Sequence, residues 1–242
     1  MKDAAAPDLF AVIDATWPAA DTTMAGGFRI REGRGGGSRV SCASLEAPLA
    51  EADIDAAIAA HRGWGQTPRF MIRPGEEALD AALAERGYEA YDPVVIYETP
   101  VHELPGAEAA MIEVPPHWPP LAVLREIWAA GDIGPARLAV MERAAGPKAA
   151  LLGRSGNRAA GVAFVALHAG TAMLHALFVP PAFRRRGLAQ EIMRESLRWS
   201  AAQGAERFTL VVTRANAPAR AVYERMGMQA MIGYHYRREA AK

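Results

Sequence analysis

The chain of 242 residues has little cysteine, no excess of either charge and no long apolar run. Its single cysteine, Cys42, cannot form an intramolecular disulfide. The 27 basic and 27 acidic side chains leave no net field that would attract nucleic acid or an anionic membrane. We therefore expect neither of these as a partner.

Targeting and metal-binding patterns are also missing. Residues 1–10 lack the basic start and apolar run of a signal peptide, so we expect a cytoplasmic protein. No apolar stretch approaches the roughly 20 residues that cross a bilayer. Histidine and cysteine do not show the spacing of a zinc site, so no metal is expected. A homodimer is possible for this chain.

Prolines concentrate in residues 99–120, a density that disfavours helix interiors and central strands. We interpret this stretch as a linker and predict two domains, residues 1–104 and 105–242. In the first domain, strands are expected at 27–31, 39–43, 69–72 and 94–98, and helices at 54–61 and 78–86. In the second, helices are expected at 121–130, 135–144, 188–203 and 217–226, and strands at 149–153, 161–167, 173–179 and 208–212.

An internal repeat relates the two parts of the chain. Residues 72–90 align without gaps with residues 212–230, and the alignment places Gly87 opposite Gly227. We infer two copies of one αβ unit. The alternative is that any strand followed by a glycine-capped helix produces such a match.

The most specific motif is VPPAFRRRGLA at residues 179–189, between an expected strand and an expected helix. A helix N-terminus presents unpaired N–H groups and the positive end of the helix dipole, which suit a phosphate. Gly187 lets the backbone approach a ligand closely, and the small Ala189 leaves the approach open. Three arginines add positive charge, although such a run also fits a solvated face: Arg184, Arg185 and Arg186.

A second motif, NAPARAVYERMGM, covers residues 216–228. Together the two motifs resemble the GCN5-related N-acetyltransferase (GNAT) superfamily over residues 121–237. Met228 stands where the family usually has Phe, a mild departure because Met also fills apolar space. Family positions of the second motif are occupied by Asn216, Ala221, Tyr223 and Gly227.

The resemblance implies the GNAT fold, an α/β fold with a mixed, mostly antiparallel sheet flanked by helices, here in two tandem copies of which the first is reduced. It also implies that the loop and helix start hold the pyrophosphate of acetyl-CoA, and that the backbone N–H of Val179, on a splayed strand, meets the oxyanion. The expected acetyl-CoA contacts are Leu177, Phe178, Val179, Arg184, Arg185, Arg186, Gly187, Leu188, Ala189 and Asn216.

Two residues are candidates for proton transfer. Tyr223 carries a phenol that stays protonated at neutral pH and can donate to a departing thiolate, although an ordinary core tyrosine is the alternative. Strand alternation places His175 on one face with Leu177 and Val179, where an imidazole could accept the proton of the amine. The surrounding strand is similar to that of the arylalkylamine N-acetyltransferases, but Met173 stands at the first position of their histidine pair. A structural histidine remains the alternative.

The first copy lacks these groups. The alignment places Leu83 opposite Tyr223, Glu76 opposite Asn216 and Ala47 opposite Gly187. Leucine cannot donate a proton, and Glu46 would repel a phosphate. We therefore predict a catalytically silent first copy, as in known tandem members of the superfamily.

These observations predict an N-acetyltransferase that moves an acetyl group from acetyl-CoA to a primary amine. Direct attack in a ternary complex is expected, because the only cysteine lies in the silent copy and no other nucleophile suggests a covalent intermediate. The balanced charge favours a small-molecule acceptor. The rival hypothesis is a protein that senses acetyl-CoA without turnover.

Overall fold

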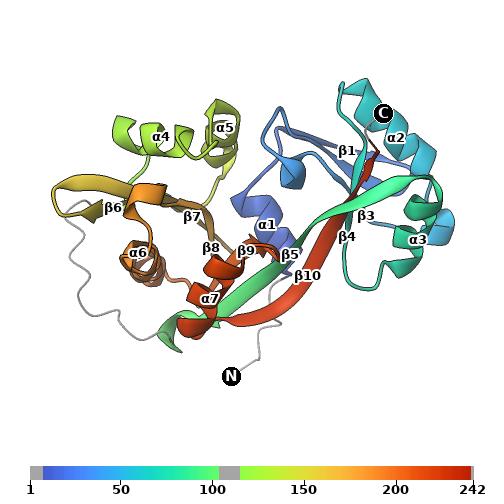
Figure 1. The fold of residues 1–242 in the computed structure, drawn as a ribbon. Coiled ribbons are helices and arrows are strands. Elements are labelled where there is room, and N and C mark those ends of the chain that lie inside the picture. The colour runs from blue at the N-terminus through green and yellow to red at the C-terminus, as the bar shows by residue number, and fades with distance from the viewer. Residues whose placement is uncertain (1–7, 104–114, 241–242) are drawn as a thin grey trace. The chain divides into compact units, whose positions relative to one another are not determined.

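The computed structural model describes residues 8–103 and 115–240, so part of the predicted linker lies outside the described residues. The described chain forms two compact units (Figure 1). Unit 1 comprises the described parts of Met1–Pro18 and Tyr97–Val211, together with Pro218–Ala230. Unit 2 comprises Ala19–Ile96, Val212–Ala217 and the described part of Met231–Lys242.

The two units are interleaved along the chain, whereas the sequence predicted one boundary between residues 104 and 105. The start of the chain belongs to unit 1, and its last strand completes the sheet of unit 2. Local sequence patterns predict a strand but not its partner, because pairing depends on segments that are far apart in the sequence.

Unit 2 begins with a meander of short strands and ends with two helix-strand steps. Its helices are α2 (Ile54–Gly63) and α3 (Glu77–Glu85). Its strands are β1 (Asp21–Ala25), β2 (Phe28–Glu32), β3 (Ala43–Leu45), β4 (Arg69–Ile72), the first part of β5 (Tyr88–Pro100) and the last part of β10 (Gln229–Glu239). The strand order is β1-β2-β3-β4-β10, in which only the pair β3-β4 is parallel. The core includes Phe28, Phe70, Leu79 and Leu83.

Unit 1 carries the larger set of helices: α1 (Leu9–Thr16), α4 (Ala122–Ala129), α5 (Pro135–Arg143), α6 (Leu188–Ala202) and most of α7 (Ala217–Arg225). Its strands are the end of β5, β6 (Lys148–Ser155), β7 (Arg158–His168), β8 (Thr171–Phe178) and β9 (Arg207–Thr213), in the order β5-β9-β8-β7-β6. The pairs β6-β7 and β7-β8 are antiparallel, and β8-β9 is parallel. Figure 1 shows α4 and α5 on one face of β6 and β7 and α6 on the other. The predicted fold class is thus confirmed.

The predicted strand at residues 39–43 is wrong. A 3-10 turn, η1 (Ser38–Val40), occupies its first part, and β3 begins only at Ala43. The hydroxyl of Ser41 donates to the carbonyl of Gly37 at 2.9 Å and closes the turn. This local bond competes with strand pairing. The sequence reading also missed α1 and β1.

The two parts of the chain share an order of elements. Strands β1-β2-β3, helix α2, strand β4, helix α3 and strand β5 are followed later by β6-β7-β8, α6, β9, α7 and β10. Helices α3 and α7 occupy corresponding positions in the ungapped sequence alignment. Two copies of one unit would produce this order.

Two glycines bring α6 close to the sheet of unit 1. Gly153 on β6 faces Gly161 on β7. A Cβ atom at either glycine would come within 2.6 or 2.8 Å of Cδ1 of Ile192, and Leu188 lies beside both positions. Because α6 packs through its first turns, the glycine pair sets the height of the helix N-terminus above the strands.

A buried histidine makes the stability of unit 2 depend on acid. His61 is fully buried, and its Nε2 lies 3.1 Å from the carbonyl of Arg69. Burial lowers the pKa of His61 from 6.5 to about 4. The unfolded chain therefore takes up a proton between these pH values that the folded chain does not, so the free energy of unfolding falls as pH drops through this window.

We predict that His61→Gln, which keeps an N–H donor, removes this loss of unfolding free energy at acid pH. The loss is a few kcal/mol at most, because each unit of pKa difference contributes about 1.4 kcal/mol. Urea unfolding of parent and variant between neutral pH and pH 4 measures it. The exposed His168→Gln is the control and should keep the parental slope. An unchanged slope in His61→Gln would contradict the prediction.

Candidate active site

The strands β8 and β9 separate at their carboxyl ends. As parallel neighbours they pair from Thr171–Arg207 to Leu174–Leu210. Strand β8 then continues to Phe178, and β9 continues to Thr213. The splay implied by the family resemblance is therefore present. It lies where α/β proteins commonly bind ligands, at the carboxyl ends of parallel strands.

A β-bulge interrupts β8 just after its last pair with β9. Phe164 on β7 faces His175, whereas Val162, two residues earlier, faces Phe178, three residues further along β8. The extra residue is accommodated at Ala176, whose φ is 51°. The carbonyl of Ala176 accepts a hydrogen bond of 2.9 Å from Nε1 of the buried Trp128.

The bulge changes one sequence inference. Strict alternation would place His175, Leu177 and Val179 on one face, but an inserted residue breaks the alternation after His175. Val179 also lies beyond the end of β8. The ring of Phe178 packs against Gly131, where a Cβ atom would approach it to 2.7 Å.

The loop after β8 is exposed and is shaped by left-handed residues. A 3-10 turn, η4 (Pro181–Phe183), leads into Arg184, whose Nε donates to the carbonyl of Val179 at 2.9 Å. Arg185 has φ 59°, and Gly187 has φ 81°. Glycine adopts this region without the steric cost that other residues meet. Arg184 to Gly187 are all exposed.

The N-terminus of α6 has no side-chain cap. Gly187 occupies the cap position, and the heavy atom nearest to a Cβ built there is Oε1 of Glu191, at 4.0 Å. The first N–H groups of a helix lack intrahelical acceptors. This helix start therefore offers donors to an anion, with open space around the cap residue.

The corresponding helix start in unit 2 is closed by its own side chain. Pro48 and Pro180 have nearly the same backbone angles and each precedes a 3-10 turn, η2 (Leu49–Glu51) or η4. After η2 the chain reaches Asp53, whose carboxylate accepts from the N–H groups of Asp55 and Ala56 at 2.9 and 3.0 Å. Asp53 is thus the N-cap of α2, as Gly187 is the N-cap of α6.

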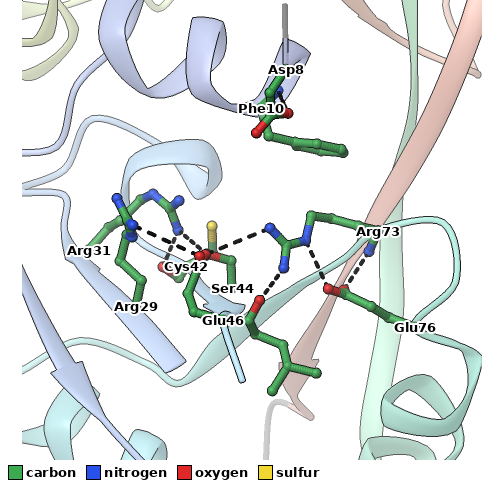
Figure 2. Close-up of polar contacts among 10 residues, drawn as sticks. Asp8, Phe10, Arg29, Arg31, Cys42, Ser44, Glu46, Arg73 and Glu76 are labelled. Atoms are coloured by element: carbon green, nitrogen blue, oxygen red, sulfur yellow. Dashed lines mark hydrogen bonds and ion pairs between the residues drawn. The ribbon is translucent and has the colours of Figure 1, made fainter. Parts of the chain in front are cut away.

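Glu46 is also neutralised within unit 2 (Figure 2). Its carboxylate lies 3.6 Å from Nη1 of Arg73 and 3.8 Å from Nη2 of Arg29, and it accepts from the hydroxyl of Ser44 at 2.8 Å. These partners hold the carboxylate in place beside β3. The carboxylate of Glu46 is thus paired within unit 2, and the silence of the first copy stays a prediction.

His175 is enclosed by residues from the N-terminal part of the chain. Its Nε2 lies 2.9 Å from Oγ1 of Thr16, and its ring stacks on Trp17 with centroids 4.9 Å apart. The hydroxyl of Thr16 donates to the carbonyl of Val12, so its oxygen accepts from His175. This assigns the proton to Nε2 and makes Nδ1 the basic nitrogen. The sequence reading missed these partners, although Asp8 is a typical N-cap for α1.

Tyr223 lies on α7 and is 7% exposed. Burial and the neighbouring Tyr97, whose ring centroid is 5.7 Å away, raise the pKa of Tyr223 to about 12. The hydroxyl of Tyr97 donates to Glu224 at 2.6 Å and accepts from Nε of Arg220 at 3.2 Å. The phenol of Tyr223 therefore keeps its proton throughout the physiological range.

Asn216 is described with the other unit. Asn216 lies in the turn after β9, where its N–H donates to the carbonyl of Thr213 at 3.0 Å, and it belongs to unit 2. Its contact with acetyl-CoA stays a prediction. The loop, His175 and Tyr223 belong to unit 1, as do Leu188 and Ala189 at the start of α6.

Within residues 8–103 and 115–240, no cluster of His, Cys, Asp or Glu has the makings of a metal site. The helices in these ranges include none that is long and apolar enough to span a membrane.

Residues 116–228 match the family model described as Acetyltransferase (GNAT) family. These residues form a GNAT acetyltransferase domain. The match contains the splayed strands, the exposed loop, the uncapped α6 and Tyr223, and it confirms the resemblance. A search among curated proteins finds no match.

Solved structures share the fold of much of the chain. A GCN5-related N-acetyltransferase from Kribbella flavida has TM-score 0.73 and 16% identity, over 96% of this chain and 94% of that one. A functionally unknown conserved protein from Staphylococcus epidermidis ATCC 12228 has TM-score 0.68 and 14% identity, over 94% and 97% of the two chains. A GCN5-related N-acetyltransferase from Sphaerobacter thermophilus has TM-score 0.56 and 14% identity, over 75% and 65%. At these identities the likeness concerns the fold alone.

We predict that Trp128→Phe destabilises the GNAT domain by about 1–3 kcal/mol, because the carbonyl of Ala176 loses its buried donor. Urea unfolding measures the change. Trp199→Phe, at a partly exposed position on α6, is the matched control and should cost less. If the two variants unfold alike, the indole hydrogen bond does not hold the bulge.

Proposed function

We propose that the GNAT domain transfers an acetyl group from acetyl-CoA to a primary amine of a small molecule, by direct attack in a ternary complex. The observation that carries the proposal is the uncapped N-terminus of α6 beside the splayed ends of β8 and β9. Its N–H groups and the exposed loop before it suit the pyrophosphate of acetyl-CoA. Open space around Gly187 supports the fit.

Positive charge on the loop would add to this binding. Arg184, Arg185 and Arg186 are exposed, and the bond from Arg184 to Val179 uses one of the five guanidinium donors. Gly187 contributes its left-handed backbone. Leu177, Phe178 and Val179 are the residues of the splayed strand and its continuation, where the N–H of Val179 is proposed to face the thioester oxygen.

The raised pKa of Tyr223 refines its proposed role. Full transfer of a proton from a phenol with a pKa of about 12 to a thiolate with a pKa of about 8.5 costs about 5 kcal/mol. A hydrogen bond to the charge that develops on sulfur does not carry this cost. We therefore assign Tyr223 to stabilising the departing thiolate. Attack by a neutral amine leaves one excess proton on nitrogen, and this proton passes first to the base and then to the thiolate.

His175 is the proposed base for that amine. Its Nε2 is engaged with Thr16, so proton acceptance falls to Nδ1. The stacked Trp17 holds the ring in its plane. The balanced charge of the chain favours a small, soluble acceptor, and we also propose a cytoplasmic location with Cys42 as a buried free thiol. A homodimer is compatible with this proposal.

The alternative is a protein that binds acetyl-CoA without turnover. The deep burial of Tyr223 favours it, because a buried phenol is less accessible to a departing thiolate. Binding and turnover must therefore be measured separately.

We predict that Gly187→Glu abolishes acetyl-CoA binding measured by calorimetry, because it adds a carboxylate at the helix start. Gly204→Glu is the matched control: Gly204 also has φ 81°, also has open space, and follows the other end of α6. The control should bind as the parent does. Equal binding by both variants, or no binding by the parent, would contradict the proposed site.

We predict that Tyr223→Phe lowers kcat about 100-fold or more in an amine screen, with the Kd for acetyl-CoA unchanged, because the loss concerns only the departing thiolate. Tyr91→Phe, in unit 2, is the control and should keep full turnover. Unchanged kcat in Tyr223→Phe would remove Tyr223 from the chemistry. An absence of turnover with every amine, despite tight binding by the parent, would favour the sensor.

A further inference from the structure

Unit 2 contains a cavity of about 340 Å³ at the carboxyl end of β4 and the start of α3. Pockets for small ligands usually measure roughly 300–1,000 Å³. The cavity shares no residue with the loop and helix start of the GNAT site. Its lining is rich in charge and includes Arg73, Glu77, Asp80, Arg214 and His235.

Asp80 and Arg73 make ion pairs with residues behind the lining. Both oxygens of Asp80 accept from Arg237, at 2.7 and 3.0 Å, and one of them also meets His235 at 2.8 Å. The hydrogen bonds from Arg237 and His235 help to lower the pKa of Asp80 to about 2. Arg73 is held by Glu76 at 2.8 Å and by Glu46 (Figure 2).

The carboxylate of Glu77, unlike that of Asp80, accepts from a backbone N–H group. It lies in the first turn of α3 and is exposed, and it accepts from the backbone N–H of Gly75 at 3.1 Å. Such a bond satisfies one lone pair of a carboxylate that has about four. Oxygen sites thus remain for a donor that enters the cavity.

Arg214 is positioned by its own backbone and by a glycine. Its N–H donates to the carbonyl of Pro93 at 2.7 Å, which fixes the residue at the rim. A Cβ atom at Gly233 would lie 3.0 Å from Nη2 of Arg214 and 2.7 Å from the carbonyl oxygen of Val94. Glycine at this position therefore makes room for the guanidinium against the strand.

We propose that this cavity binds a small zwitterion of the amino-acid class, with its carboxylate on Arg214 and its ammonium group on Glu77. A ligand of net negative charge would meet Glu77 and Asp80, and one of net positive charge would meet Arg73 and Arg214. An apolar ligand would desolvate all four charges without replacing their hydration. A zwitterion matches the balanced lining and uses the bidentate geometry of a guanidinium.

The experiment titrates the full-length parent with each of the standard L-amino acids by calorimetry. The N-acetyl and amide derivatives of the tightest ligand, each of which lacks one charge, follow. The parent should show saturable binding of at least one amino acid. Arg214→Met and Glu77→Gln should each weaken that binding about tenfold or more.

The derivatives give each variant a specific signature. Arg214→Met should no longer matter for the amide, which has no carboxylate, and Glu77→Gln should no longer matter for the N-acetyl derivative, which has no ammonium group. Glu85→Gln, an exposed position on the same helix outside the cavity lining, should bind as the parent does. Acetyl-CoA binding, measured on the same samples, should be unchanged in all variants, so the outcome is independent of the proposed function.

Three results would overturn the proposal. One is an absence of saturation with any amino acid at roughly 10 mM, which leaves no specific binding. Another is binding that both variants retain at parental strength, which places the ligand elsewhere. The third is that Arg214→Met weakens binding of the amide, and Glu77→Gln binding of the N-acetyl derivative, as much as each weakens binding of the amino acid, which contradicts the assigned pairing of charges.

Discussion

The separation of β8 from β9 after the Leu174–Leu210 pair is the constraint on which the GNAT site depends. If the two parallel strands stayed paired to their ends, their backbone N–H and C=O groups would be used by the hydrogen bonds between them. The bulge at Ala176 redirects β8, and the indole of Trp128 satisfies the carbonyl that the ladder no longer serves. The buried Trp128 on α4 thereby stabilises the bulge at which β8 departs from β9.

The same backbone arrangement leads to a capped helix N-terminus in unit 2 and to an uncapped one in unit 1. A proline, a 3-10 turn and a helix follow β3 in unit 2 and β8 in unit 1. Asp53 supplies an anion to α2 from within the chain, so that helix start needs no ligand. Gly187 supplies none to α6, so its donors face solvent or a bound anion. One cap residue therefore separates a closed helix start from an open one.

Charge is handled differently as well. Unit 2 pairs several of its charges in local networks around Glu46 and Asp80. Such networks satisfy partly buried groups that would otherwise be costly. The cavity beside them retains Glu77 and Arg214 as groups that a dipolar ligand could use.

The sequence by itself determined the local elements and the chemistry of the motif. Local sequence patterns predicted β4 and α6, and the glycine-arginine loop at residues 179–189 indicated an anion-binding helix start. Only the tertiary structure decided that the last strand belongs to unit 2, that α1 brings Thr16 to His175, and that a bulge breaks the alternation of β8. Helices and caps depend on neighbours within a few residues, whereas strand partners, bulges and burial depend on packing between distant segments, which no local pattern records.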